Sequence, residues 1–211
     1  MSHEHVGALL LAAGQSRRMG ASNKLLIPIN GTPMVRLCAQ QLIAAGMAPL
    51  VVTGHDRAAI HAALDGLAVT FAHNADFATG QAGSIACGMR AVTSRHSARP
   101  PTAMVIALAD MPMVTSECIG ALCANHLALA DAERRITMPI YQGRRGNPVI
   151  WGQIFFEALM QLTGDQGGRQ LLGAHKAALN LMEWQDDSIH LDVDTPDAYS
   201  QVTQTNYDDQ G

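Results

Sequence analysis

Short, continuous apolar runs alternate along the chain with longer segments in which apolar residues recur every three or four positions. A run such as residues 6–13, which ends at a glycine, is typical of a strand buried on both faces of a parallel sheet. A polar turn at residues 142–147 joins two of the later runs. The runs predict strands at residues 6–13, 49–53, 68–72, 102–109, 136–140, 148–151, 180–184 and 189–193.

The segments with helical spacing follow most of these runs. Asp56 and Thr115 stand where a side chain can cap the helix that follows, and Pro196 suits the first position of a last helix. The polar tail, residues 203–211, is expected to fray. The spacing predicts helices at residues 32–45, 56–64, 80–92, 115–130, 154–161 and 168–178, and one more from Pro196.

This alternation of strands and helices predicts an α/β fold. We expect a three-layer sandwich with a Rossmann-like, mostly parallel sheet and helices on both faces. No repeat, linker or low-complexity block divides the sequence, so a single domain over residues 1–211 is expected, with an ordered core at about residues 6–202. Ligands of such sheets bind beyond the carboxyl ends of the strands, which directs attention to the loops after Ala13 and at Asp110.

Composition narrows the possible functions. Apolar residues make up 48% of the 211 residues and charged residues 15%, which excludes a disordered chain. The formal charge of −4 argues against a protein that binds duplex nucleic acid, so an anionic ligand would need a few local donors or a metal. The apolar stretch at residues 8–13 is far below the ~20 residues that span a bilayer, and no signal peptide precedes it, so we expect a cytoplasmic protein without membrane contact.

Several common sites are absent from the sequence. The four cysteines, Cys38, Cys87, Cys118 and Cys123, form no C-x-x-C pair, so reduced thiols are expected rather than a structural zinc site. No H-E-x-x-H or G-x-S-x-G motif occurs, which disfavours a zinc protease and a serine hydrolase. The glycine spacing of a dinucleotide-binding dehydrogenase is also missing.

The loop after the first predicted strand combines small residues with basic ones. Small residues let backbone N–H groups approach phosphate oxygens closely, and Arg17, Arg18 and Lys24 add positive charge. Lys24 is one of only two lysines in the chain. A solvated loop with surface arginines is the alternative interpretation. The segment reads Leu11-Ala12-Ala13-Gly14-Gln15-Ser16-Arg17-Arg18-Met19-Gly20, followed after two residues by Asn23-Lys24-Leu25-Leu26.

A carboxylate ends the buried run at residues 102–109. Asp110 would be costly at the tip of a core strand unless it is paired, caps a helix or binds a cation. Mg²⁺ in proteins takes one or two carboxylates together with substrate phosphates, so Asp110 is a candidate ligand. The alternative is that Asp110 only forms the turn before Pro112.

The pattern Leu-Ala-Ala-Gly-x-Ser-x-Arg-Met-Gly-x-x-Asn-Lys-Leu-Leu resembles the signature loop of the molybdopterin nucleotidyltransferases, within the NTP-transferase superfamily. Ala13, where guanylyltransferase relatives more often have glycine, favours the CTP-using branch, the molybdenum cofactor cytidylyltransferases. The resemblance extends from about residue 6 to residue 199 and implies a fold like that of the nucleotide-diphospho-sugar transferases. It implies that the nucleotide contacts Leu11, Ala12, Ala13, Gly14, Ser16, Arg18 and Lys24.

The same resemblance assigns roles near the metal. It implies that Arg18 and Lys24 contact the triphosphate and act in catalysis, and that Asp110 is the main magnesium ligand. Asp194, in the segment before Thr195 and Pro196, would be the second ligand, with Asp192 as a weaker candidate. The alternative is that Asp194 or Thr195 simply caps the last helix, which is compatible with a metal role.

Three further segments match the family. Gly80 and Ser84 would lie in the nucleotide-base pocket, unless this segment is only a flexible helix start. Asn147 stands where the family often has His, so a hydrogen-bonding role toward the pterin is expected there in place of acid–base chemistry. Asp165 and Arg169 would bind the acceptor, although a capped turn is the alternative, and Gly168 replaces an alanine of that motif. Nearby Arg144 and Arg145 can be plain surface charges.

The resemblance implies a Mg²⁺-dependent transfer of CMP from CTP to the phosphate of molybdopterin, which gives molybdopterin cytosine dinucleotide and pyrophosphate. Transfer from GTP, or to another small phosphorylated acceptor, is one alternative. A non-enzymatic carrier that brings the cofactor to a client molybdoenzyme is another.

Overall fold

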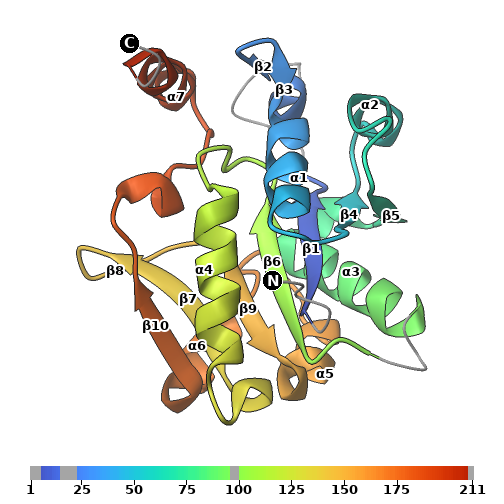
Figure 1. Cartoon of the computed structure of the whole chain (residues 1–211). Coiled ribbons are helices and arrows are strands. Elements are labelled where there is room, and N and C mark those ends of the chain that lie inside the picture. The colour runs from blue at the N-terminus through green and yellow to red at the C-terminus, as the bar shows by residue number, and fades with distance from the viewer. Residues whose placement is uncertain (1–5, 15–22, 96–99, 209–211) are drawn as a thin grey trace.

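The computed structural model describes residues 6–14, 23–95 and 100–208. At its centre is an eight-stranded sheet with the strand order β10-β7-β9-β6-β1-β4-β5 and with β8 paired to β7 (Figure 1). A separate two-stranded sheet pairs β2 (Pro28–Ile29) with β3 (Thr32–Pro33). The strands of the main sheet are β1 (Val6–Ala12), β4 (Leu50–Thr53), β5 (Thr70–His73), β6 (Ala103–Leu108), β7 (Ile136–Tyr141), β8 (Arg144–Arg145), β9 (Val149–Gly152) and β10 (Leu179–Glu183).

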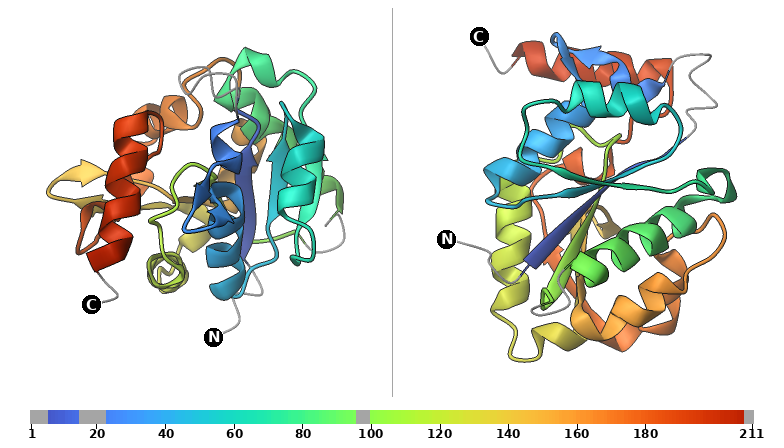
Figure 2. Two further views of the ribbon diagram at one scale, coloured as in Figure 1. Left: turned by 90° about the horizontal axis from the view of Figure 1, so that it is seen from above. Right: turned by 90° about the vertical axis from the view of Figure 1, so that its right-hand side faces the viewer.

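Helices cover both faces of this sheet. Helices α1 and α4 pack together on one face, and α3 and α5 pack together on the other (Figures 1 and 2). The α-helices are α1 (Met34–Ala44), α2 (Arg57–Ala63), α3 (Gln81–Arg95), α4 (Ser116–Leu127), α5 (Phe156–Met160), α6 (Arg169–Ala174) and α7 (Pro196–Asp208). Short 3-10 turns are η1 (Lys24–Leu26), η2 (Phe77–Thr79), η3 (Ala132–Arg134), η4 (Gln153–Phe155), η5 (Lys176–Ala178) and η6 (Asp187–His190). None of the helices in the described ranges is long and apolar enough to cross a membrane.

The three-layer α/β prediction is confirmed, and β1 shows why its sequence is apolar throughout. Leu10 packs into the core under α1 and α4, whereas Leu9 and Leu11 pack into the core under α3 and α5. Both cores exclude water, so the strand has no polar side. The sheet is mostly parallel: β1 pairs parallel with β4 and β6, and β9 runs antiparallel to both of its neighbours.

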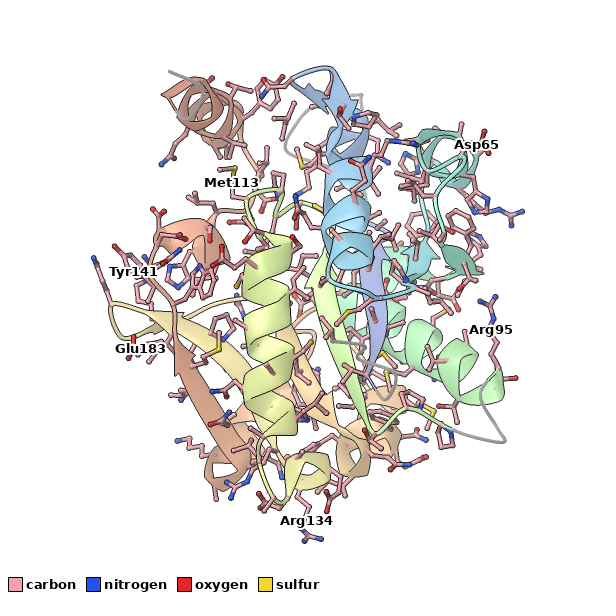
Figure 3. All side chains as sticks on the ribbon, viewed as in Figure 1. Asp65, Arg95, Met113, Arg134, Tyr141 and Glu183 are labelled. Carbon is pink, nitrogen blue, oxygen red and sulfur yellow. The ribbon has the colours of Figure 1, made fainter. Side chains whose placement is uncertain are left out.

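The end of the chain packs over the β2–β3 hairpin (Figure 2). Ile29, Val193 and Val202 belong to a third buried cluster, and Met113 packs against it near α7 (Figure 3). The Tyr199 hydroxyl donates to the Pro28 carbonyl at 2.7 Å. Helix α7 extends to residue 208, into the polar segment that is expected from its composition to fray.

The predicted strand at residues 189–193 is wrong. Its alternating apolar residues lie in and just after η6, where Ile189 and Val193 are fully buried without joining the sheet. An alternation of apolar and polar residues indicates which side chains are buried. Here the buried side chains belong to a connecting segment that runs from the edge of the sheet toward α7. The predicted turn at residues 142–147 contains β8, which pairs with the end of β7.

One of the two predicted caps is confirmed. Thr115 accepts a hydrogen bond from the Cys118 N–H at 3.2 Å. Asp56 takes a left-handed backbone conformation with φ of 53°, and its side chain makes no capping hydrogen bond to the described chain. A cap needs an extended backbone to aim its oxygen at the helix, and Asp56 does not provide one.

The cysteines are free thiols, as predicted, and Cys38, Cys118 and Cys123 are buried. Burial raises the pKa of the Cys118 and Cys123 thiols to about 12, because an apolar environment disfavours the thiolate. Burial also raises the pKa of Cys38 and Cys87. The thiols are therefore unreactive near neutral pH.

A cluster of hydrogen-bonded polar side chains lies between α4, β7 and β10. The His126 Nδ1 lies 2.8 Å from the hydroxyl oxygen of Thr137, and the Asn180 amide donates to the same oxygen at 3.2 Å. His126 and Thr137 are both inaccessible to solvent, and the His126 Nε2 has no partner among the described residues. Burial lowers the pKa of the imidazole, since a charged ring would place an unsatisfied N–H in the core.

This histidine should make stability depend on pH. The unfolded chain binds a proton near pH 6.5, the ordinary value for His, whereas folded His126 does so only at lower pH. Its contribution is therefore complete above about pH 6.5 and is lost as the pH falls, by up to about 1.4 kcal/mol per pH unit. We expect His126→Gln to flatten the dependence of the free energy of unfolding on pH between 7 and 5. Equal slopes in the wild-type and His126→Gln proteins would contradict this account.

Candidate active site

The Lys24 ammonium joins three distant parts of the chain. Lys24 donates to the Asp110 carboxylate at 2.7 Å and also to the Asp194 carboxylate. These partners lie 86 and 170 positions away along the sequence. Lys24 is only 8% exposed, so its charge needs these partners. The structure thus brings together Lys24, Asp110 and Asp194, as expected for one site.

Local structure holds each member of this group in place. Lys24 begins η1, where the Asn23 side chain accepts from the Leu25 N–H at 3.1 Å. Asp110 follows β6, and its backbone carbonyl accepts from the Val193 N–H at 2.9 Å. The buried Val193 side chain thus fixes the segment that presents Asp194. The last helix is capped by another residue, since the Thr195 hydroxyl accepts from the Ala198 N–H at 3.2 Å.

The charges in this group affect one another. Burial alone would lower the pKa of the Lys24 ammonium, but the charges of Asp110 and Asp194 and the hydrogen bonds to them raise it above its ordinary value. Partial burial raises the pKa of the Asp192 carboxyl, and the negative charges of Asp194 and Asp110 raise it further. Asp192 is therefore a near neighbour of the ion pair.

The predicted nucleotide-binding loop is only partly described. Leu11, Ala12 and Ala13 are buried, so a ligand could reach their backbone more readily than their side chains. Gly14 is exposed at the end of this segment. Ser16 and Arg18 lie outside the described residues.

The other predicted nucleotide contacts lie at the start of α3. Ser84 is buried, and its hydroxyl accepts from the Asn74 amide at 3.1 Å. Gly80 has φ of 116°, and a Cβ there would lie 2.6 Å from the Gly164 carbonyl oxygen. That carbonyl accepts from the Ala82 N–H at 3.2 Å. The loop that carries Asp165 therefore packs directly on the start of α3.

A cavity of about 400 Å³ opens between the sheet, α3 and α6. Leu11 and Leu108, near the carboxyl ends of β1 and β6, belong to its wall, so it lies near the strand end that carries Asp110. The inner wall includes the buried Val149 and Trp151. Polar residues at the exposed side are Gln81, Arg145, Gln166 and Arg169.

The cavity is lined by two of the three predicted acceptor-binding residues and by further residues that the sequence did not indicate. Asn147 and Arg169 line it, whereas Asp165 lies beside Gly80. The cavity is also lined by Arg145, for which a plain surface charge was one expectation, and by Gln81 and Trp151, which no motif indicates. No local signal marks these residues, because β8, α3 and β9 meet only through the fold.

Residues 8–179 match the family model for the MobA-like NTP transferase domain. This range includes Lys24, Asp110 and the whole lining of the cavity.

Curated relatives with different names align over most or part of the chain. The chain is 26% identical to a nicotine blue oxidoreductase from Paenarthrobacter nicotinovorans, covering 90% of this chain and 92% of that protein. It is 26% identical to the purine catabolism protein PucB of Bacillus subtilis, covering 96% and 98%. A probable molybdenum cofactor guanylyltransferase from Natronomonas pharaonis is 34% identical, over 53% of this chain and 52% of that protein.

Solved structures share the fold over nearly the full length. A homologue of the Mycobacterium tuberculosis protein Rv0371c, from Mycobacterium sp. strain JC1, has a TM-score of 0.80 at 23% identity, with 99% of each chain covered. A nucleotidyl transferase from a Methanothermobacter species also has a TM-score of 0.80, at 19% identity, covering 97% and 98%.

Removing the central cation should destabilise the protein. Lys24→Met removes a positive charge from beside the carboxylates of Asp110 and Asp194, which also lie close to that of Asp192. We expect a loss of about 1–3 kcal/mol in the free energy of unfolding, measured by urea titration in EDTA. Millimolar Mg²⁺ or Mn²⁺ should recover part of this loss by supplying another cation.

The second lysine provides the control. Lys176 lies in η5, and Lys176→Met should leave the unfolding free energy unchanged with or without the divalent ion. Equal stability of the two variants in EDTA would contradict the central role given to the Lys24 ammonium.

Proposed function

The chain belongs to the MobA-like NTP transferase domain family and is a nucleotidyltransferase, and on this premise we propose that it transfers CMP from CTP to the terminal phosphate of molybdopterin. The proposal rests on one observation: Lys24, Asp110 and Asp194 lie together at the carboxyl end of β6, which also borders the cavity. A nucleotide bound over the first loop and an acceptor in the cavity would approach each other beside these residues.

The carboxylates suit a magnesium ion. The Lys24 ammonium already occupies a cation position between Asp110 and Asp194, and oxygen ligands are those that Mg²⁺ prefers. Within the described residues, no three metal-binding side chains are grouped closely enough to hold an ion alone. Substrate phosphates and water would complete the coordination, as they do for Mg²⁺ in many enzymes. A magnesium ion bound there would neutralise charge that develops on the phosphates.

The reaction needs positioning more than proton transfer. An oxygen of the acceptor phosphate would form a bond to the α-phosphorus of CTP, and the bond from that phosphorus to the bridging oxygen would break. The electron pair leaves with pyrophosphate. Because a phosphate nucleophile is already ionised near pH 7, no protein base is required, and catalysis depends on orientation and charge stabilisation. Lys24, once released from the carboxylates, and Arg18 would contact the triphosphate.

Features of the first loop support nucleotide binding. A Cβ at Gly14 would meet no described protein atom within 4 Å, and the backbone there is not in the left-handed region. No described residue occupies the space beside Gly14, which leaves room for a ligand to approach the backbone there. The preference for CTP over GTP rests on Ala13, and the choice of molybdopterin rests on the motif resemblance. A relative named as a molybdenum cofactor guanylyltransferase supports the acceptor class.

The carboxylate that ends β6 should be essential for turnover. Asp110→Asn keeps the shape of the side chain but removes its charge, and we expect turnover to fall about 10²–10³-fold. Pyrophosphate release from CTP with purified molybdopterin and Mg²⁺ measures this. Asp65→Asn, an exposed change beside α2 (Figure 3), should keep wild-type turnover. Near-wild-type activity of a folded Asp110→Asn protein would refute the assignment.

The nucleotide preference can be measured separately. The four nucleoside triphosphates, each labelled at the α-phosphate, are offered with molybdopterin and Mg²⁺, and CTP should give the fastest transfer. Faster transfer from GTP would replace the cytidylyl assignment by the guanylyl one. Tight CTP binding that needs no metal and releases no pyrophosphate would favour the cofactor carrier.

A further inference from the structure

The wall of the cavity contains a glycine that departs from the family motif and lies against a tryptophan. Gly168 stands where the acceptor-segment motif has alanine, and a Cβ on Gly168 would lie 2.8 Å from the Trp151 Cζ2. The same Cβ would lie 3.5 Å from Cη2 and 3.7 Å from Cε2, so the clash is with the benzene ring of the indole. Gly168 has φ of −72°, which any residue adopts. The close approach of Trp151, and not the backbone, therefore requires glycine.

Trp151 is held rigidly in this position. It belongs to β9, paired with Met104 of β6 on one side and with Ile136 of β7 on the other. Its ring meets the Phe155 ring edge-on, with centroids 6.0 Å apart. Trp151 lines the cavity, and since only 2% of it is exposed, a small part of its side chain reaches the cavity. A fixed aromatic surface of this size can meet a planar ring edge-to-face or offset.

The helix that begins after Gly168 brings a cation to the cavity. Arg169 is the first residue of α6, and Arg145 reaches the same cavity from β8. Both are exposed, and neither forms an ion pair with any described residue. The distance of closest approach between Trp151 and Gly168 sets where α6 starts, and so where Arg169 lies relative to the aromatic wall.

We propose that Trp151 and Gly168 together determine acceptor specificity, with Trp151 contacting a planar heteroaromatic ring and Arg169 and Arg145 binding an anionic group on the same molecule. This inference rests on the proposed function and adds the two residues that select the acceptor. Asn147 and Gln81 also line the cavity, and their side-chain amides would form hydrogen bonds with the edge of the ligand's ring.

Fluorescence of the two tryptophans tests the contact directly. In Trp184→Phe protein only Trp151 emits, and in Trp151→Phe protein only Trp184 emits. Neopterin monophosphate, a planar pterin that carries a phosphate, should quench Trp151 in a saturable way and leave Trp184 unchanged after the same absorbance correction. Ribose 5-phosphate, which lacks the ring, should quench neither. Equal quenching of both tryptophans, or quenching by CTP in place of the pterin, would overturn the proposal.

Steady-state kinetics with molybdopterin test whether Gly168 and Trp151 act together. Gly168→Ala should raise the KM for molybdopterin about 10-fold, because the added methyl group moves α6 and Arg169, while the KM for CTP stays unchanged. Trp151→Phe alone should raise the KM for molybdopterin about 5-fold by loss of aromatic contact. The double variant should have a KM near that of Trp151→Phe, since the clash has gone. Equal rises in both KM values, or additive effects in the double variant, would refute the pairing.

The two proposals can fail separately. Absence of CTP-dependent pyrophosphate release would refute the proposed function, whereas saturable quenching of Trp151 would still support a planar anionic ligand in the cavity. Pyrophosphate release by a protein whose Trp151 does not respond to the pterin would refute the specificity proposal alone. If Gly168→Ala protein does not fold, the pterin titrations of the single-tryptophan proteins still decide the matter.

Discussion

The ammonium of Lys24, between the carboxylates of Asp110 and Asp194, is the interaction on which the arrangement of the site depends. Carboxylates brought together at the end of a buried strand repel each other and lose hydration, and the buried Lys24 cation offsets part of both costs. The hydrogen bond from Val193 to the Asp110 carbonyl and the burial of Val193 then fix the late segment against the sheet. The ion pair thus joins the first loop, the end of β6 and the approach to α7 in one position.

The two expected substrate regions are connected through a second contact. Gly80 allows the loop at Gly164 to lie directly on the start of α3, and that loop leads into Gly168 and α6. The loop at Gly164 and the start of α3 therefore hold each other in place by close packing of backbone on backbone. The cavity wall at Trp151 and the nucleotide side of the site are thus neighbouring parts of one packed structure.

Sequence patterns predicted the layers of the fold and much of the site, for identifiable physical reasons. Continuous apolar runs such as β1 are diagnostic because both faces are covered, and Lys24 and Asp110 stand out because charges beside core strands need partners. The strand predicted at residues 189–193 does not form, because alternating apolar residues indicate which side chains are buried and not whether a neighbouring strand is present to pair with them. Trp151 and Gln81 were missed because their common cavity exists only after β9 and α3 have packed together.

A net charge of −4 is unexpected for a protein that binds phosphates, but the short range of electrostatic forces in salt solution explains it. Charges in solvent are screened beyond about 8 Å at physiological ionic strength, so the total matters for a long polyanion and hardly at all for one triphosphate. What matters is the local sign. Lys24 lies at the carboxylates and Arg145 and Arg169 line the cavity, so three positive charges lie where a small anion would bind. The acidic excess includes the carboxylates themselves, which would attract a divalent cation and thereby add positive charge beside the phosphates.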